Sequence, residues 1–322
     1  MSKLRQFVAV TLCLVLFSST SQAWFNVGHM AVAYVAYQQL TAEKKVRVAA
    51  LLKKNPYYNK QWKALIPAGT PADQRDLMLF MIAATWPDQI KEKGSTYQND
   101  GDNPPTDGSA WTNTGYGDLK QHKYWHYIDI PLTQDGTAPL AAIPTPNAET
   151  QIAIFRQTLT SGSNDKLKSF DLVWLLHLVG DVHQPLHSTT RISAGELGGD
   201  HGGNGVKIDA AAVGNPNKKL HLFWDSLPGD VSSPSEALAA AITYGKTLAP
   251  ADPVLAKKAD ASDWISESFD IARTVVYSDP ISAGDGPFTV TSVYNDKAQK
   301  IAAERVALAG QRLANIINNE LK

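Results

Sequence analysis

The sequence predicts an all-α protein: a single compact, mainly helical domain with long surface loops. Segments with helical periodicity dominate the chain, strand-like alternation is scarce, and no repeat of solenoid period occurs. With 322 residues, 43% of them hydrophobic and 19% charged, the chain is able to bury a large core. Its formal net charge of −1 gives no global attraction for polyanions, so any positive charge that meets one must be local.

The first 23 residues have the pattern of a signal peptide. Lys3 and Arg5 precede an apolar stretch that is shorter than the roughly 18–20 residues a membrane-spanning helix needs. The tripeptide at 21–23 (SQA) is a small-x-small cleavage site. We therefore expect residues 1–23 to be cleaved, which leaves a secreted or periplasmic domain over residues 24–322.

Cleavage changes what the chain offers chemically. It removes Lys3, Arg5 and Cys13, so the mature chain is more acidic and has no cysteine. An exported chain without disulfides needs a large core, a bound metal, or both. The cut also frees the α-amino group of Trp24, which titrates near ~8 and is able to bind a metal as a neutral amine.

Helical patterns follow one another in the first part of the chain. Residues 28–52 are Ala-rich and amphipathic, and the Asn-Pro pair at 55–56 ends this predicted helix. A Thr-Pro pair before residues 72–84 is typical of a helix N-terminus. Pro87 lacks an N–H and clashes one turn back, so we expect it to kink or end that helix just before Asp88.

The rest of the chain has the same character. Residues 170–182 are apolar nearly all round, which predicts a central buried helix. We predict further helices over residues 148–158, 218–225, 235–248, 261–276 and 292–319. Two glycine-rich stretches, 94–121 and 191–217, are predicted to be long surface loops of the kind that usually carries function.

Two His-x-x-x-Asp pairs lie within predicted helices. His177 and Asp181 share one face of the central helix, and His221 and Asp225 repeat the spacing. A buried carboxylate needs a compensating positive charge, and zinc binds imidazole and carboxylate ligands. For one pair alone, a hydrogen-bonded structural pair stays open as the alternative.

Further candidates enlarge this set beyond what one zinc ion binds. His187 extends the first motif, and two or three metals about 3.5–4 Å apart would form a clamp that hydrolyses phosphoesters. His126 with Asp129, and Asp88, are weaker candidates, because a histidine with aromatic neighbours is more often a core residue.

Other catalytic signatures are excluded. Gly245-Lys246-Thr247 resembles the end of a phosphate-binding loop, but Ala240 stands where the first glycine is required. Neither an HExxH metalloprotease motif nor a GxSxG nucleophile elbow occurs.

Six motifs carry a family resemblance. They are, in order, WFNVGH, ATWPDQI, WHYIDI, LLHLVGDVHQPLH, GGDHGGN and LHLFWD. With them the chain resembles the zinc-dependent S1/P1 nuclease family, which is related to the zinc-dependent phospholipase C enzymes. The resemblance covers nearly all of the mature chain and implies an all-α fold with three Zn²⁺ at the bottom of a cleft.

The resemblance also implies ligands and roles, position by position. The first zinc would be held by Asp88, His126, His177 and Asp181. The second would be held by His187, His221 and Asp225. The third would be held by the amine and carbonyl of Trp24, by His29 and by a bridging Asp181.

Four further residues receive catalytic or binding roles from the same resemblance. Asp129 would orient a water that attacks phosphorus from between the first two ions. Lys91 would stabilise the charge of the transition state. Tyr127 and Asn204 would line the base pocket or bond the base.

The implied function is hydrolysis of RNA and single-stranded DNA to 5′-phosphorylated products, with 3′-nucleotidase activity. We expect a monomer that does not bind membranes and that takes single strands because their bases are free to stack on a pocket wall. Two alternatives stay open: a zinc-dependent phospholipase C, which uses a glutamate at the position of Asp225, and a non-catalytic exported zinc-binding protein. Asp129 and Lys91 argue against the latter, because neither is needed to hold metal.

Overall fold

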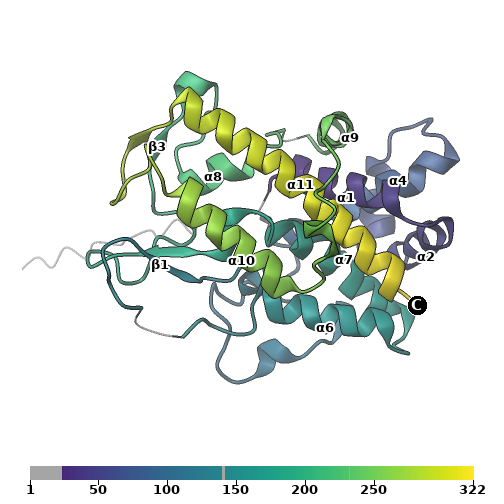
Figure 1. Ribbon diagram of the computed structural model, residues 1–322. Coiled ribbons are helices and arrows are strands. Elements are labelled where there is room, and N and C mark those ends of the chain that lie inside the picture. Colours follow the sequence, from purple (N-terminus) through teal and green to yellow (C-terminus); the bar gives the residue numbers. More distant parts are fainter. Residues whose placement is uncertain (1–23, 140–141, 232) are drawn as a thin grey trace, which may run out of the picture.

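Helices form nearly all of the regular structure, and the predicted all-α fold is confirmed (Figure 1). The computed structural model describes residues 24–139, 142–231 and 233–322, so the expected leader lies outside the described residues. The helices are α1 Asn26–Gln39, α2 Ala42–Leu52, α3 Lys63–Leu65, α4 Ala72–Ala83, α5 Trp86–Gln89, α6 Ala148–Thr160, α7 Asp165–Asp181, α8 Leu220–Asp225, α9 Pro234–Thr247, α10 Ala261–Ile271 and α11 Ser292–Glu320. Short strands pair in parallel, β1 Pro131–Thr133 with β2 Thr190–Ile192 and β3 Ile208–Asp209 with β4 Phe288–Thr289.

Helix α7 runs through the centre of the molecule. Every residue from Lys168 to Asp181 is buried, as the all-round apolar pattern predicts. Helices from both halves of the chain pack against it, namely α1, α2, α5, α6 and α11. The polar side chains near its C-terminal end are therefore presented inside the protein.

The first predicted helix is in fact two helices. Residues 28–52 divide between α1 and α2 because Leu40 is extended and Thr41 caps the second helix. The Thr41 hydroxyl accepts a hydrogen bond from the backbone N–H of Lys44 at 3.3 Å. A capping side chain satisfies a helix N–H that has no partner within the helix, so a new helix begins there.

The helix break near Pro87 falls earlier than predicted, and Asp88 lies inside a second helix rather than after the break. Helix α4 ends at Ala83, and Pro87 lies in the first turn of a separate short helix, α5. Pro is tolerated at that position because the first helical N–H groups have no partner within the helix. This arrangement turns the buried side chain of Asp88 towards the interior beside α7.

A shell of tryptophans packs around α7. The ring of Trp174 meets Trp86 and Trp125 edge-on, with centroids 6.1 and 5.0 Å apart. The same ring lies edge-on to His126 at 5.4 Å. Seven of the eight tryptophans in the chain are fully buried, so a large aromatic core surrounds the polar end of α7.

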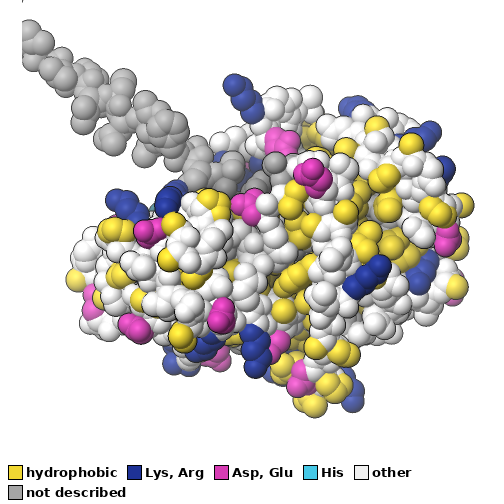
Figure 2. Space-filling view, turned by 90° about the horizontal axis from the view of Figure 1, so that it is seen from above, with side chains coloured by type: hydrophobic (Ala, Val, Ile, Leu, Met, Phe, Trp, Pro, Cys, Tyr) yellow, Lys and Arg dark blue, Asp and Glu magenta, His cyan; other side chains and the backbone are white. Residues whose placement is uncertain are grey.

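The surface is of mixed character. In Figure 2, basic and acidic side chains are interspersed with apolar ones, and no histidine is visible on that face. Seven of the eight histidines are buried; the exception is His201. Within the described ranges, no helix has both the length and the apolar character needed to cross a bilayer.

The longest helix, α11, crosses the molecule and packs directly on α1 (Figure 1). Gly310 makes this close approach possible. A Cβ at Gly310 would lie 2.6 Å from Cβ of Val35 and 2.9 Å from the backbone oxygen of Val32. A side chain there would force the two helices apart.

We therefore expect Gly310→Ala to lower the free energy of unfolding by about 1–3 kcal/mol, the usual cost of overpacking a core. Gly162→Ala is the control, because a Cβ at that exposed glycine meets nothing within 4 Å. Urea unfolding of both variants measures the difference. Equal stabilities would show that the two helices separate without cost.

Candidate metal centre

Histidine and aspartate side chains from distant parts of the chain meet in the interior. Their nitrogen and oxygen atoms form three groups, in each of which one atom from every residue lies within 4.8 Å of the others. The groups are His29, His177 and Asp181; Asp88, His126 and His177; and His187, His221 and Asp225. All eight residues are buried, and all eight were predicted from the sequence.

The first two groups share His177 and therefore adjoin. His177 Nε2 lies 3.4 Å from Asp181 Oδ1 and 3.7 Å from Asp88 Oδ1. His29, whose ring stacks on that of His177, places its Nε2 3.3 Å from the same Oδ1, and His126 Nδ1 is 3.0 Å from Oδ2. Asp181 thus stands between the histidines of both groups, at the C-terminal end of α7.

The third group has the second His-x-x-x-Asp pair on α8. His221 Nε2 lies 3.3 Å from Asp225 Oδ2. His187, in the 3₁₀ turn Pro185–Ser188, places its Nε2 3.2 Å from His221 Nε2. The spacing of four residues puts both α8 side chains on one face of the helix, as predicted.

Backbone carbonyls fix which nitrogen of three imidazoles carries the proton. Nδ1 of His177 lies 2.8 Å from the oxygen of Ala84, and Nδ1 of His187 lies 2.8 Å from that of His126. Nδ1 of His221 lies 2.6 Å from the oxygen of Gly202. A carbonyl only accepts, so each Nδ1 donates and each Nε2 presents a lone pair to the centre.

Several buried side-chain atoms of these residues have no hydrogen-bond partner. They are both ring nitrogens of His29, His126 Nε2, Asp181 Oδ1 and Asp225 Oδ2. Carboxylate oxygens and imidazole lone pairs repel one another at these distances unless a cation lies between them. The donor set of nitrogen and oxygen atoms fits zinc or a similar divalent ion.

Burial dominates the protonation of these groups. It lowers the pKa of His29, His126 and His177, and neighbouring histidines and Lys91 add to the effect. Burial also raises the pKa of Asp181 and Asp225, with the charge of Asp88 as a further cause. Neutral imidazoles are the form that binds metal, whereas the carboxylates need a cation to be ionised here.

Lys91 forms an ion pair with Asp88, a member of the second group. Its Nζ lies 2.6 Å from Asp88 Oδ1, and both side chains are almost fully buried. The two residues are three apart across the end of α5, so they meet on one side of that turn. An ammonium group is thus placed directly beside the buried carboxylate of Asp88.

Trp24 is tied to both ends of the centre. Its indole Nε1 donates to the oxygen of Gly180 at 3.1 Å, and the N–H of Phe25 donates to the oxygen of Asp225, also at 3.1 Å. These two acceptors belong to the residue before Asp181 and to a candidate ligand. The backbone of Trp24 is therefore held next to Asp181 and Asp225, and its role as a ligand, which the family resemblance implies, stays a prediction.

A small pocket is lined by Tyr127 and Asp129, which follow His126 in the chain, together with Asp102 and Pro146. The Tyr127 hydroxyl donates to the backbone oxygen of Asp102, which fixes the ring. Burial raises the pKa of Asp129 to about 6; the charge of Asp200 adds to this and that of His201 opposes it.

Asn204 lies apart from that pocket, on the second glycine-rich loop. Its Nδ2 donates to the oxygen of His201 at 2.9 Å, while its Oδ1 is buried without a partner. The same loop supplies Gly202, the carbonyl that orients His221. Asn204 thus lies on the loop that contacts His221 of the third group. Tyr127 instead follows His126, a member of the second group, in the chain.

Gln184 is a residue of the centre that sequence reasoning missed. Its Nε2 donates to Asp225 Oδ1 at 2.7 Å, and its Oε1 accepts from the N–H of Leu186. This side chain orients a carboxylate on another helix, 41 residues away. The QPLH sequence gives no local signal for such a contact.

The fold and this centre define the class of protein: an all-α domain that buries groups of His and Asp side chains able to hold metal. The chain belongs to the S1/P1 nuclease family, whose sequence model matches residues 24–322. It is similar to Nuclease S1 of Aspergillus oryzae (strain ATCC 42149 / RIB 40), at 26% identity over 159 residues. That alignment covers 44% of this chain and spans about half, 51%, of the relative.

His122, which the sequence left outside the ligand set, forms a separate cluster under the first glycine-rich loop. Its Nε2 lies 3.0 Å from Asp118 Oδ2 and its Nδ1 3.2 Å from Asp100 Oδ2. The ring stacks on Trp125 at 3.6 Å. Burial by itself would lower the pKa of His122, but its hydrogen bonds with Asp100 and Asp118 raise it overall.

This cluster predicts a pH dependence of stability. A histidine whose pKa is raised on folding stabilises the protein fully below its unfolded pKa of about 6.5, and the effect is lost as pH rises through the folded pKa. We expect the destabilisation caused by His122→Gln to be larger at pH 6 than at pH 9. Urea unfolding of both proteins at each pH tests this, because the metal centre contributes equally to both. An equal cost at both pH values would contradict it.

Proposed function

We propose that this protein is a secreted or periplasmic metal-dependent phosphodiesterase that hydrolyses RNA and single-stranded DNA to 5′-phosphorylated products and removes phosphate from 3′-nucleotides. One observation carries the proposal: three adjoining groups of buried His and Asp side chains present unpartnered donor atoms. Membership of the S1/P1 nuclease family supports the reaction class.

The proposed ligand sets combine the three groups with the further ligands, Asp181 and Trp24, that the family resemblance implies. Asp88, His126, His177 and Asp181 would hold one Zn²⁺, and His187, His221 and Asp225 would hold a second. His29, Asp181 and the N-terminal residue Trp24 would hold a third. When bound, such ions act as Lewis acids that neutralise phosphoryl oxygens and lower the pKa of water.

The protein's own groups have distinct roles around a bound phosphate. Lys91 Nζ, fixed by Asp88, places a positive charge where an equatorial phosphoryl oxygen gains negative charge. The Asp129 carboxylate accepts a hydrogen bond from the attacking water and so orients it. The raised pKa of Asp129 brings its proton affinity close to that needed for acid–base work.

Substrate selection would depend on the pocket walls. The Tyr127 ring, fixed through its hydroxyl, offers a surface on which a base stacks, and stacking tolerates every base. The buried Oδ1 of Asn204, which has no partner within the protein, would accept a hydrogen bond from a base or sugar that reaches it. A duplex keeps its bases paired and stacked, so we propose that single strands are the preferred substrate. We also propose that the enzyme is a monomer that needs no partner subunit.

The reaction is tested with two matched substitutions on α7. Asp181→Asn removes a carboxylate from the centre, and we expect kcat/KM on single-stranded RNA and DNA to fall by at least about 100-fold. Asp171→Asn is the control: the same change on the same helix, at a side chain that Asn113 bonds and whose pKa burial raises to about 7.

The assay has outcomes that contradict the proposal. Chelation should abolish hydrolysis and added Zn²⁺ should restore it, with duplex DNA cut more slowly than single strands. Undiminished activity after exhaustive chelation would refute metal dependence. Release of diacylglycerol from phosphatidylcholine without attack on RNA would identify a phospholipase C instead.

The N-terminal ligand has its own test. A chain that begins at Trp24 should bind one metal ion more than a chain with a single alanine before Trp24, because an amide nitrogen does not replace the amine as a ligand. Metal analysis of the two proteins measures the difference. Equal metal content would refute the role of the Trp24 amine and leave the other two ions unaffected.

A further inference from the structure

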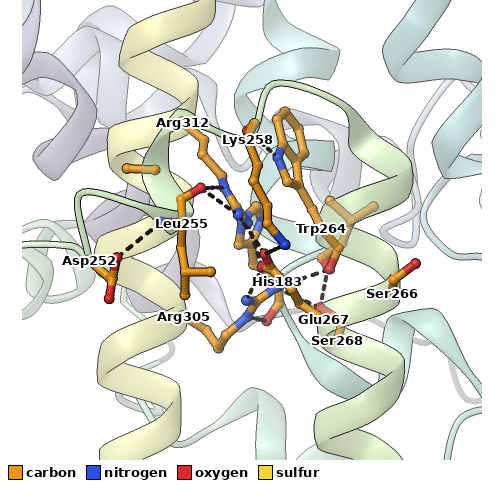
Figure 3. A network of polar contacts seen from close by, with 12 residues as sticks. His183, Asp252, Leu255, Lys258, Trp264, Ser266, Glu267, Ser268, Arg305 and Arg312 are labelled. Carbon is orange, nitrogen blue, oxygen red and sulfur yellow. Dashed lines mark hydrogen bonds and ion pairs between the residues drawn. The ribbon is translucent and has the colours of Figure 1, made fainter.

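A second polar cluster lies behind the metal centre, between α10 and α11 (Figure 3). Arg305 and Arg312 are seven residues apart on α11, so they point from one face of that helix. Both guanidinium groups bond Glu267 of α10, with Oε2 at 2.8 Å from Nη1 of each arginine. The arginines are 4% and 1% exposed.

This cluster is attached to the turn that follows α7. Arg305 Nε donates to the backbone oxygen of His183 at 3.2 Å. Ser268 Oγ donates to the oxygen of Val182 at 2.6 Å and accepts from Arg305 Nη2 at 2.8 Å. Carbonyls at a helix C-terminus have no partner within the helix, and a cation is favourable there.

The imidazole of His183 completes the attachment. Its Nδ1 lies 2.7 Å from the oxygen of Val179, so Nδ1 donates, and Nε2 accepts from Arg312 Nη1 at 2.8 Å. Both ring nitrogens are thus occupied within the protein. This explains why His183, unlike its neighbour His187, faces away from the metal centre although both belong to one motif.

The turn at residues 182–184 is connected to the first and the third group of the centre. It directly follows Asp181, and Gln184 within it bonds the carboxylate of Asp225. Three residues further on, His187 presents its Nε2 to His221. A shift of this turn would therefore move ligand atoms of the first and third groups.

We propose that Arg305 and Arg312, held by Glu267, are positioning residues for the metal centre: they fix the turn at 182–184 and so aim Asp181, His187 and Asp225. This rests on the proposed metal binding. Glu267 is ionised for this purpose, because its bonds to the two arginines outweigh burial and lower its pKa to about 2.

The test compares metal affinity with stability. Arg305→Lys keeps the charge but loses the fork of donors, and Ser268→Ala removes only the hydroxyl that bonds Val182. Zn²⁺ affinity is measured by competition with a chromogenic chelator, and the absorption spectrum of Co²⁺-loaded protein reports ligand geometry. Urea unfolding in excess chelator measures the stability of the metal-free chain.

Each variant has a matched control. Arg156→Lys alters an arginine that likewise bonds a glutamate on α11, Glu320, and a backbone oxygen, that of Ala259. Ser266→Ala removes a hydroxyl from α10 that bonds only its own helix, at Ser262. Neither control residue contacts the turn at 182–184 among the described contacts.

We expect Arg305→Lys and Ser268→Ala to weaken Zn²⁺ binding by about 10- to 100-fold and to change the Co²⁺ spectrum, as loss of groups that orient ligands usually does. Both controls should bind Zn²⁺ with an affinity within about twofold of that of the unaltered protein, because neither residue contacts the turn at 182–184. If Arg305→Lys does not fold, Ser268→Ala decides.

Unchanged affinity and spectrum in the folded variants, whatever their stability, would overturn the positioning role and leave the proposed function standing. Weakened binding in a protein that cleaves no nucleic acid would support the positioning role and refute the proposed function. An unaltered protein that binds no divalent metal would overturn both.

Discussion

Buried carboxylates without enough positive charge around them are the constraint on which the rest of this structure depends. Asp88, Asp181 and Asp225 lie in the interior with Lys91 as the ammonium group that pairs with one of them. Each ionised carboxylate removed from water costs several kcal/mol unless it is neutralised. Divalent cations among these oxygens and the imidazole lone pairs would neutralise them, so metal binding and folding are expected to be coupled.

Two surrounding layers give the centre its geometry. Backbone carbonyls from three distant segments orient His177, His187 and His221 through Nδ1. The Trp174 ring and its aromatic neighbours pack beside α7, with the His126 ring 5.4 Å from that of Trp174. Buried, oriented groups interact more strongly with charge than the same groups in water, which favours phosphoryl chemistry.

The support of the centre also reaches helices that supply no ligand. Glu267, Arg305 and Arg312 connect α10 and α11 to the end of α7, with Ser268 bonding the adjacent carbonyl. On the opposite side, close contact at Gly310 joins α11 to α1, the helix that carries His29. The C-terminal helix thus links two ligand-bearing helices that are about 150 residues apart in the chain.

The sequence by itself determined the helices and the set of His and Asp residues that meet. Helical period, caps and prolines act within a few residues, and the two His-x-x-x-Asp pairs lie within single helices. Tertiary structure alone decided that His183 bonds Arg312 while His187 faces His221, and that Gln184 holds Asp225. The physical reason is that these partners lie 34 to 129 residues apart, and only packing of the helices sets which donor meets which acceptor.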